Sequence, residues 1–303
     1  MDSPKTLIVI AGPTAIGKTD LAIKLALHYK TEIISADSRQ FYREMTLGTA
    51  KPSDHELAQV KHHFINSHSI DQPFSVGDFE TEVLTLLDEL FKLHDIVILV
   101  GGSGLFIKAI TEGFDVLPKA DMAIRENLNK LFAEHGIKAL QEKLLALDPG
   151  YYQEVDLNNP QRLIRALEVC ISSGFPFSSY RKNAINKRNF NSVKICLNTD
   201  RETLYSRINL RVDQMIENGL IDEVKSLVPY QNLNALNTVG YTEVFQYLKG
   251  EITLTEAVES IKQNTRRFAK RQLTWFRKDS GFAWFEPCAF SEILEYIYER
   301  TRL

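Results

Sequence analysis

Cysteine is scarce in this sequence. Cys170, Cys196 and Cys288 are the three cysteines among 303 residues, and they lie far apart. Since no CxxC pair occurs, the sequence indicates neither a zinc site nor a disulfide framework, and a reducing cytosol is the expected compartment. The seven histidines include His62-His63 but form no HxxxH pattern with a helical acid nearby. We therefore expect the histidines on the surface rather than on a metal.

Long hydrophobic runs are also missing. The apolar run 7–11 is too short for a signal peptide or a membrane span, so we interpret it as a first strand and expect no membrane association. Hydrophobic residues make up 44% and charged residues 25%, as in ordinary globular proteins. The length suits one large domain or two unequal ones. With a net charge of −3, a nucleic-acid binder would need its basic residues gathered in patches.

Short apolar runs alternate with helical patterns in the first third of the chain. Strands are predicted at 6–11, 31–37 and 95–100, with helices at 17–29 and 79–93 between them. This order predicts an α/β fold: a doubly wound parallel sheet flanked by helices.

The pattern changes near residue 115. Residues 122–147 and 161–174 are helical, the second helix closed by Gly174, with a loop predicted at 148–160. A strand returns at 192–198, and helices follow at 201–219, 241–250 and 254–278. We predict a core of residues 1–115 plus 192–303, interrupted by a mostly helical insertion domain of residues 116–191.

The stretch "GPTAIGKT" fits the phosphate-loop pattern GxxxxGK[ST] between a predicted strand and a predicted helix. Backbone N–H groups and the helix N-terminus would face an anion there, Lys18 supplies a charge, and the Thr19 hydroxyl suits Mg²⁺. The predicted phosphate site comprises Gly12, Pro13, Thr14, Ala15, Ile16, Gly17, Lys18 and Thr19.

The acid that many ATPases carry after a second hydrophobic strand is absent. The strand at 95–100 ends in Gly101-Gly102-Ser103, and Asp95 precedes it. Asp37 instead follows the strand at 31–37, on the edge where open α/β sheets bind ligands. It is either a catalytic acid-base group or the cap of a turn.

Basic residues gather in two stretches. Residues 261–278 hold seven basic residues and no acid, and Arg266, Arg267, Lys270 and Arg271 share one helical face. Phe268, Trp275 and Phe276 are expected to pack inward. In 160–190, Arg162, Arg165, Arg181, Lys182, Lys187 and Arg188 stand against Glu168 alone. Both patches suggest a polyanionic substrate.

Arg207 and Arg211 lie one helical turn apart in a further predicted helix. Either could reach a phosphate, and the pattern does not choose between them.

At this point a family resemblance becomes visible. The chain resembles the bacterial tRNA dimethylallyltransferases over nearly its full length. The motifs that carry the resemblance are, in order, "GPTAIGKT", "ISADSRQFYREMTLGTAKP", "LVGGSGLF", "NPQRLIRALEV", "RVDQMIENGLIDEV", "VGYTEV" and "TRRFAKRQLTWFRK". The resemblance implies transfer of a dimethylallyl group from dimethylallyl diphosphate to the exocyclic amine, N6, of the adenine 3′ of the anticodon, with release of diphosphate.

The resemblance also implies roles for residues. Asp37 would be the general base, Lys18, Thr19 and Mg²⁺ would steady the leaving diphosphate, and Arg211 would hold it. The tRNA anticodon arm would bind between core and insertion, with the target base flipped out. Its expected contacts are Asp37, Ser38, Arg39, Gln40, Ser103, Arg125, Gln161, Arg162, Leu163, Ile164, Arg165, Arg266, Lys270 and Arg271. A monomer is expected.

Three other activities remain open. An adenylate isopentenyltransferase would use free AMP or ATP, a phosphate-loop kinase would use Asp37 as base toward a hydroxyl, and a non-enzymatic protein would only bind RNA. The basic insertion favours tRNA over a free nucleotide.

Overall fold

The computed structural model of the chain describes residues 5–115, 117–118, 121–181 and 186–301. The strands are β1 (Thr6–Ala11), β2 (Ile33–Ser35), β3 (His62–His63), β4 (Ile96–Gly101), β5 (Asn191–Leu197) and β6 (Ala283–Phe285). The helices are α1 (Lys18–Tyr29), α2 (Asp54–Gln59), α3 (Val76–Leu93), α4 (Gly104–Thr111), α5 (Met122–Leu147), α6 (Pro149–Glu154), α7 (Pro160–Ser173), α8 (Arg201–Glu217), α9 (Leu220–Ser226), α10 (Tyr241–Leu248), α11 (Leu254–Phe276) and α12 (Phe290–Thr301). Short 3₁₀ turns are η1 (Phe177–Tyr180), η2 (Val228–Tyr230) and η3 (Asn234–Leu236).

Within these residues the strands form a sheet in the order β3-β2-β4-β1-β5-β6, and each neighbouring pair is parallel. β1 lies in the middle, because Ile8 pairs with Ile98 of β4 on one side and with Val193 of β5 on the other. The carboxyl ends of the strands therefore meet at one edge, where the predicted phosphate loop and Asp37 follow β1 and β2. The predicted doubly wound α/β sheet is confirmed.

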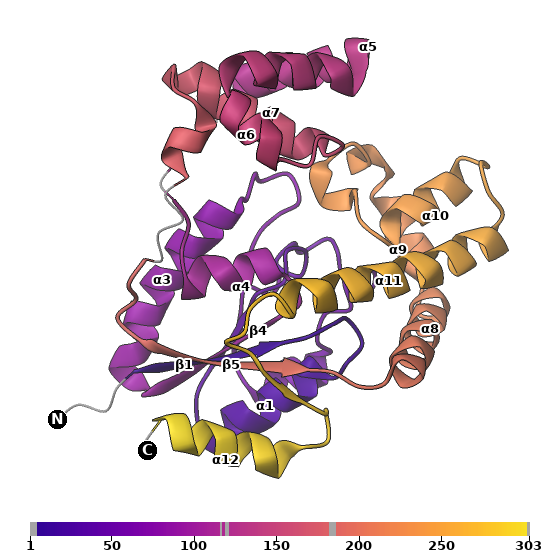
Figure 1. Cartoon of the computed structure of the whole chain (residues 1–303). Helices are drawn as coiled ribbons and strands as arrows, with labels where there is room; N and C mark the ends of the chain where they lie inside the picture. Colours follow the sequence, from indigo (N-terminus) through magenta and orange to yellow (C-terminus); the bar gives the residue numbers. More distant parts are fainter. Residues whose placement is uncertain (1–4, 116, 119–120, 182–185, 302–303) are drawn as a thin grey trace. The chain divides into compact units, whose positions relative to one another are not determined.

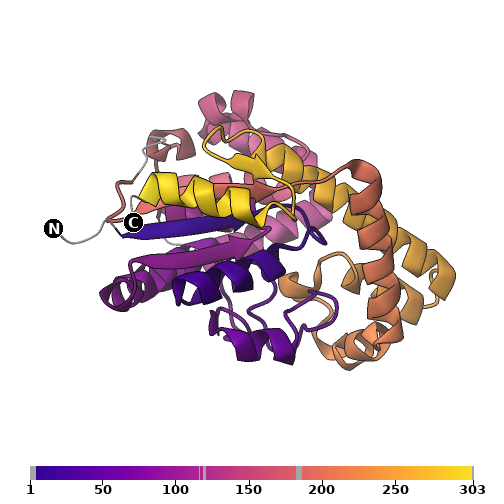
Figure 2. The same cartoon turned by 90° about the horizontal axis from the view of Figure 1, so that it is seen from below.

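Both faces of the sheet are covered by helices, and β1 shows how the sequence produces this. Leu7 and Val9 point into a core formed with α3 and α4, whereas Ile8 and Ile10 point into a second core formed with α1, α8 and α12. All four side chains are fully buried, which explains the continuous apolar run. Figure 1 shows α3 and α4 on one side of the strands and α1 and α12 on the other; Figure 2 looks onto the face covered by α1 and α12.

The chain divides into two compact units, residues 1–111 with 188–303, here called the core unit, and residues 112–187, here called the insertion unit. The insertion unit is built on α5 and α7, whose buried leucines Leu140, Leu144, Leu163 and Leu167 form its own hydrophobic core. Gly136, with φ +72°, interrupts α5, so the predicted continuous helix is two helical segments joined by a kink.

Several short elements differ from the sequence-based expectations. The predicted loop 148–160 contains α6, which Asp148 caps by accepting from Tyr151 N at 2.9 Å. β3 and β6 were not predicted, because strands of two or three residues carry no alternating pattern. Of the histidines expected on the surface, His28, His55 and His135 are exposed, whereas His62, His63, His68 and His94 are half-buried. In edge strand β3, His63 Nε2 pairs with Glu32 at 2.5 Å.

Candidate active site

The phosphate loop joins β1 to α1 at the ligand edge of the sheet. Gly12 has φ +147°, and a Cβ there would lie 2.8 Å from the carbonyl oxygen of Leu197, so glycine is required where the loop passes β5. Gly17, with φ +100°, is the N-cap residue just before α1, and no side chain caps this helix. The N–H groups of the first turn of α1 are thus available to an anion, which the helix dipole also favours.

Lys18 points back into the loop. Its Nζ donates to the carbonyl oxygen of Pro13 at 2.7 Å. Burial and, to a smaller extent, nearby Arg211 lower the pKa of Lys18 to about 8, and Asp37 opposes the shift. Two half-buried cations at one site repel each other, so a bound anion with several charges would stabilise both.

The two arginines of α8 both lie at this loop. Arg207 Nη1 donates to the carbonyl oxygen of Ile16 at 3.3 Å. Arg211 is half-buried, its pKa is lowered by burial, and its charge acts on Lys18. The sequence left the choice between them open, and the structure brings both to the phosphate loop.

Asp37 follows β2 and caps a turn. Its Oδ1 accepts hydrogen bonds from Arg39 N at 2.9 Å and from Gln40 N at 3.3 Å. Among the described residues, both hydrogen bonds that Asp37 accepts go to this one oxygen. The carboxylate also acts electrostatically on Lys18. The turn-cap interpretation is therefore correct, and the geometry leaves Oδ2 for a ligand.

The residues after Asp37 make contacts within the protein. Ser38 N donates to Ser103 Oγ at 3.1 Å, which joins this turn to the turn after β4. The Gln40 Nε2 donates to the carbonyl oxygens of Thr49 and Ala50, both at 3.2 Å. The amide hydrogens of Gln40 thereby support the loop, and the RNA contact expected of this residue stays a prediction.

The Arg39 side chain is held against the protein by hydrogen bonds to two backbone carbonyl oxygens. Its Nη1 donates to the carbonyl oxygen of Ser38 at 3.1 Å and its Nη2 to that of Asn234 at 3.3 Å. Its Nε is buried and has no partner among the described residues.

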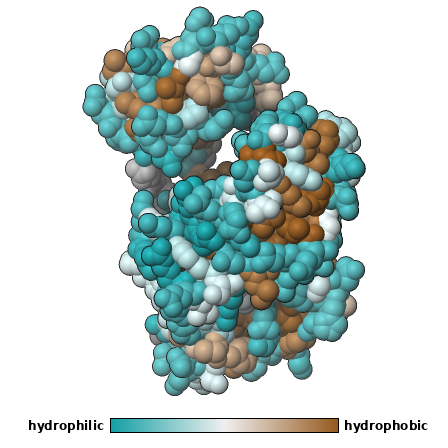
Figure 3. Space-filling model, turned by 90° about the vertical axis from the view of Figure 1, so that its right-hand side faces the viewer, coloured by the Kyte–Doolittle hydropathy of each residue, from teal (hydrophilic) through white to brown (hydrophobic). Residues whose placement is uncertain are grey.

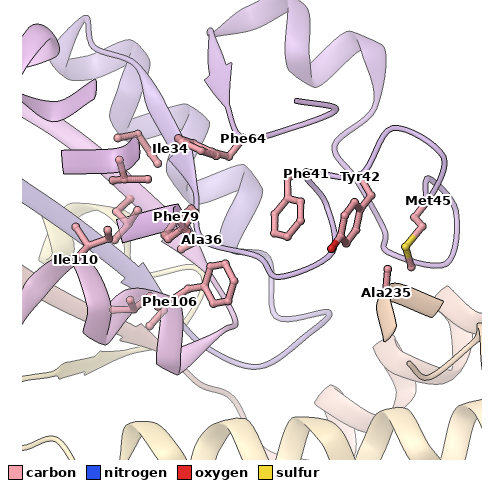
Figure 4. Packing of buried hydrophobic residues seen from close by; sticks show 14 of the residues in the cluster. Ile34, Ala36, Phe41, Tyr42, Met45, Phe64, Phe79, Phe106, Ile110 and Ala235 are labelled. Carbon is pink, nitrogen blue, oxygen red and sulfur yellow. The ribbon is translucent and has the colours of Figure 1, made fainter. Parts of the chain in front are cut away.

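Aromatic side chains anchor the loop that carries these groups. Phe41 and Tyr42 are 1% and 6% exposed. The Phe41 ring centroid lies 4.8 Å from that of Phe74 and 6.2 Å from that of Phe106 on α4. Figure 4 shows Phe41 and Tyr42 side by side, with Met45 beyond them. Because this anchor is buried, the turn at Asp37 is held in place against the core.

Glu223 is a residue of this region that sequence reasoning missed. Its carboxylate accepts from the backbone N–H groups of Thr46, Leu47 and Gly48 at 3.2, 2.7 and 3.2 Å, and from Tyr241 Oη at 2.6 Å. Burial, together with the carboxylate of Glu223, raises the pKa of Tyr241. One acid on α9 therefore fixes the far end of the loop that begins at Asp37.

Helix α11 presents cations along its exposed side. Lys270 and Arg271 are exposed and, with Thr274, Trp275 and Lys278, line a surface pocket of about 250 Å³. Arg266 differs, because its Nη1 donates to Asn209 Oδ1 at 2.7 Å. The expected inward packing is confirmed for Phe276 but is wrong for Phe268 and Trp275, which are 40% and 41% exposed.

The predicted contacts on the insertion unit fall into two groups. Gln161 and Arg162 are exposed, whereas Leu163 and Ile164 are 0% and 2% exposed. Leu163 and Ile164 belong to the hydrophobic core of this unit, so an RNA contact at these positions would involve their backbone; the contact itself stays a prediction.

An acid neutralises part of the basic patch of the insertion unit. Buried Glu168 pairs with Arg125 at 2.9 Å and with Arg165 at 3.3 Å. Arg181 pairs with Glu154 at 2.5 Å. The net positive charge counted from residues 160–190 alone therefore overstates the charge that this unit offers to a polyanion.

Two further members of that patch lie elsewhere. Arg188 belongs to the core unit, where it pairs with Glu80 at 2.6 Å. Lys182 lies outside the described residues.

Two absences apply to the part of the chain that the structure describes. No cluster of three or more His, Cys, Asp or Glu residues there could hold a metal ion. No helix there is both long and apolar enough to cross a membrane. The surface seen in Figure 3 is mostly hydrophilic, with a hydrophobic area on the core unit at the level of α9 and α10.

These groups together can bind a multiply charged anion beside a carboxylate. Lys18, Arg207, Arg211 and the α1 N-terminus supply positive charge, and Asp37 supplies a proton acceptor on the neighbouring loop. The arrangement suits a reaction in which a phosphate-bearing group leaves while a nucleophile loses a proton.

The family model described as IPP transferase matches residues 40–279. The chain belongs to the IPP transferase family. A relative from Christiangramia forsetii, named tRNA dimethylallyltransferase, is 58% identical over 92% of this chain and 93% of its own length. One of the same name from Flavobacterium johnsoniae is 51% identical over 98% and 99%. The crystal structure of a Bacillus halodurans family member, a tRNA isopentenylpyrophosphate transferase, superposes with a TM-score of 0.73 at 38% identity, covering 98% of this chain and 97% of that one. Both the family and the enzyme class predicted from the motifs are thus confirmed.

Proposed function

We propose that this protein is a tRNA dimethylallyltransferase. It transfers the dimethylallyl group from dimethylallyl diphosphate to N6 of the adenine next to the anticodon in tRNA, and diphosphate is released. Membership of the IPP transferase family and relatives of that name over nearly the full length support this reaction.

The observation that carries the proposal is the position of Asp37, whose charge acts on Lys18 of the phosphate loop. β4 ends at Gly101, and Gly102-Ser103 follow it without an acid, so the ATPase arrangement is missing, while Asp37 acts on Lys18 from the adjacent loop. The adenine nitrogen would attack the allylic carbon as the bond from that carbon to the diphosphate oxygen breaks. Asp37 would take the proton that the nitrogen loses.

The phosphate loop, Lys18 and Arg211 would hold the leaving diphosphate, Arg211 through two parallel N–H groups. The site suits Mg²⁺ that arrives with the substrate, because Mg²⁺ commonly takes one or two protein oxygens and completes its shell with phosphate and water. Thr19 would offer its hydroxyl to the ion. Bound Mg²⁺ would neutralise charge on the departing oxygens.

RNA would be held by both units. On the core unit, Lys270 and Arg271 would contact phosphates, and exposed Trp275 offers a ring on which a base can stack. On the insertion unit, which we propose as the anticodon-arm domain, Gln161 and Arg162 are the exposed members of the predicted set. A monomer acting in the cytosol remains a prediction.

The test is incubation with labelled dimethylallyl diphosphate and, separately, unmodified tRNA, AMP and ATP. We expect label in tRNA alone, at the adenine next to the anticodon. Label in AMP or ATP but not tRNA would refute the tRNA assignment in favour of an adenylate isopentenyltransferase. Phosphate transfer from ATP to a small molecule would indicate a kinase.

A further inference from the structure

A buried amide connects the phosphate loop to helix α11. Gln272 is 6% exposed, although its helix carries exposed cations on the opposite side. Its Oε1 accepts from Thr14 N at 2.9 Å, and its Nε2 donates to the carbonyl oxygen of Gly102 at 2.9 Å. Both partners are backbone groups of fixed polarity, so the orientation of the amide is determined: the oxygen must face Thr14 and the nitrogen Gly102.

The contact at Thr14 acts on Lys18 through one peptide plane. The N–H of Thr14 and the C=O of Pro13 belong to the same trans peptide and point in opposite directions. Gln272 holds the N–H end, while Lys18 Nζ donates to the C=O end at 2.7 Å. Rotation of this peptide would break both hydrogen bonds, so Gln272 sets the direction in which Lys18 is held.

The contact at Gly102 extends the connection toward Asp37. Gly102 precedes Ser103, whose Oγ accepts from Ser38 N at 3.1 Å, next to Asp37. A Cβ at position 102 would lie 2.3 Å from Gln272 Nε2, so the close approach requires glycine. The Gln272 side chain thus bridges the 102–103 turn, which is hydrogen-bonded to the residue after Asp37, and the loop that holds Lys18.

We propose that Gln272 is a positioning residue for diphosphate binding. It orients the 13–14 peptide, and through it Lys18, before the ligand arrives, and it keeps the phosphate loop and the 102–103 turn at a fixed separation. The expected effect of Gln272 on turnover rests on the proposed function. Its effect on the binding of inorganic diphosphate does not, since that binding needs no RNA and no prenyl group.

The test compares Gln272→Met, which keeps the shape of the side chain but loses both hydrogen bonds, with wild type. Isothermal titration with inorganic diphosphate and Mg²⁺ should show a dissociation constant raised about tenfold, as expected when a buried hydrogen bond is lost. The kcat for tRNA prenylation should fall, while the dissociation constant for tRNA stays within about twofold. If Gln272 had only a general structural role, its loss would weaken the binding of diphosphate and of tRNA together. The matched control is Gln246→Met on α10, an exposed glutamine.

Gly102→Ala perturbs the same bridge from its other end: Gln272 is retained, but the added Cβ would displace its amide from the carbonyl oxygen of Gly102. If Gln272→Met fails to fold, this variant decides, with the same expected loss of diphosphate affinity. Wild-type affinity for inorganic diphosphate in the folded variants would overturn the inference. If the variants bind diphosphate more weakly but the wild-type protein prenylates no tRNA, the inference on Gln272 would be supported and the proposed function refuted.

Discussion

Replacing Asp37 with asparagine should separate its two roles. Asparagine keeps an oxygen that accepts from Arg39 N and Gln40 N, but it does not act as a base. Loss of a general base costs about 10²–10⁴-fold in rate, equivalent to about 2.7–5.4 kcal/mol of transition-state stabilisation. We therefore expect the kcat of Asp37→Asn to fall by that factor, while diphosphate and tRNA affinities stay within about twofold.

Asp37→Ala provides the comparison. It removes the base and both turn hydrogen bonds, so it should lose as much rate as Asp37→Asn and also melt about 2–4 °C lower, for a loss of about 1 kcal/mol. The assay is single-turnover transfer of labelled dimethylallyl to tRNA at pH 7, where Lys18, with a pKa of about 8, remains mostly protonated. Asp54→Asn, at an exposed position in α2, is the charge-matched control and should not alter the rate.

A turnover of Asp37→Asn within about threefold of wild type would refute the base assignment. Equal melting temperatures for the asparagine and alanine variants would show that the turn hydrogen bonds contribute no stability.

Three further perturbations test other parts of the site. Lys270→Glu with Arg271→Glu should weaken tRNA binding and reduce its dependence on salt concentration, and an unchanged salt slope would mean that this face touches no phosphate. Tyr241→Phe removes a buried hydrogen bond to the Glu223 carboxylate, so the free energy of unfolding should drop by about 1.5–3 kcal/mol, measured by denaturant titration; a loss below about 0.5 kcal/mol would contradict the buried contact. The affinity for diphosphate should fall as the pH rises through about 8, because Lys18 of the unliganded protein loses its proton there. Lys18→Met should remove this fall in a calorimetric pH series, and a fall that persists would belong to another group.

Controls for these variants come from the same chain. Lys225→Glu with Lys249→Glu makes the same charge change at exposed positions on the core unit. Tyr247→Phe removes a hydroxyl from α10 without touching Glu223. Lys24→Met removes an exposed lysine from α1, so its pH series should retain the step.

Local patterns predicted the phosphate loop and the position of Asp37. The loop needs only its own glycines, Lys18 and Thr19, and the end of a buried strand is visible from its apolar run. Phe41 and Tyr42, two aromatics directly after a polar turn, were the available signal that the loop is anchored. Such features depend on residues that are close together in the sequence, and they can therefore be predicted from it.

The contacts of Glu223 and Gln272 depend on the tertiary fold. Gln272 lies 258 positions from Thr14, and Glu223 lies 177 positions from Thr46. No periodicity links such pairs, and each residue looks like an ordinary surface side chain of a helix. Trp275 was misplaced for a related reason: its exposure depends on which side of α11 faces the sheet, and the cations alone did not show this.

The place where the insertion unit leaves and rejoins the core has a consequence for folding. Arg188 Nε donates to the carbonyl oxygen of Ile110 at 2.8 Å, and just beyond, Asn186 N donates to that of Glu112 at 2.8 Å, so the outgoing and returning chains are clamped together. For the folding of the core unit, the whole insertion then behaves as one closed loop, and the entropic cost of closing a loop grows only logarithmically with its length. Doubling it would cost the core about 0.6 kcal/mol. A longer or shorter unit between the same two clamped ends would therefore change the stability of the sheet and its ligand edge very little.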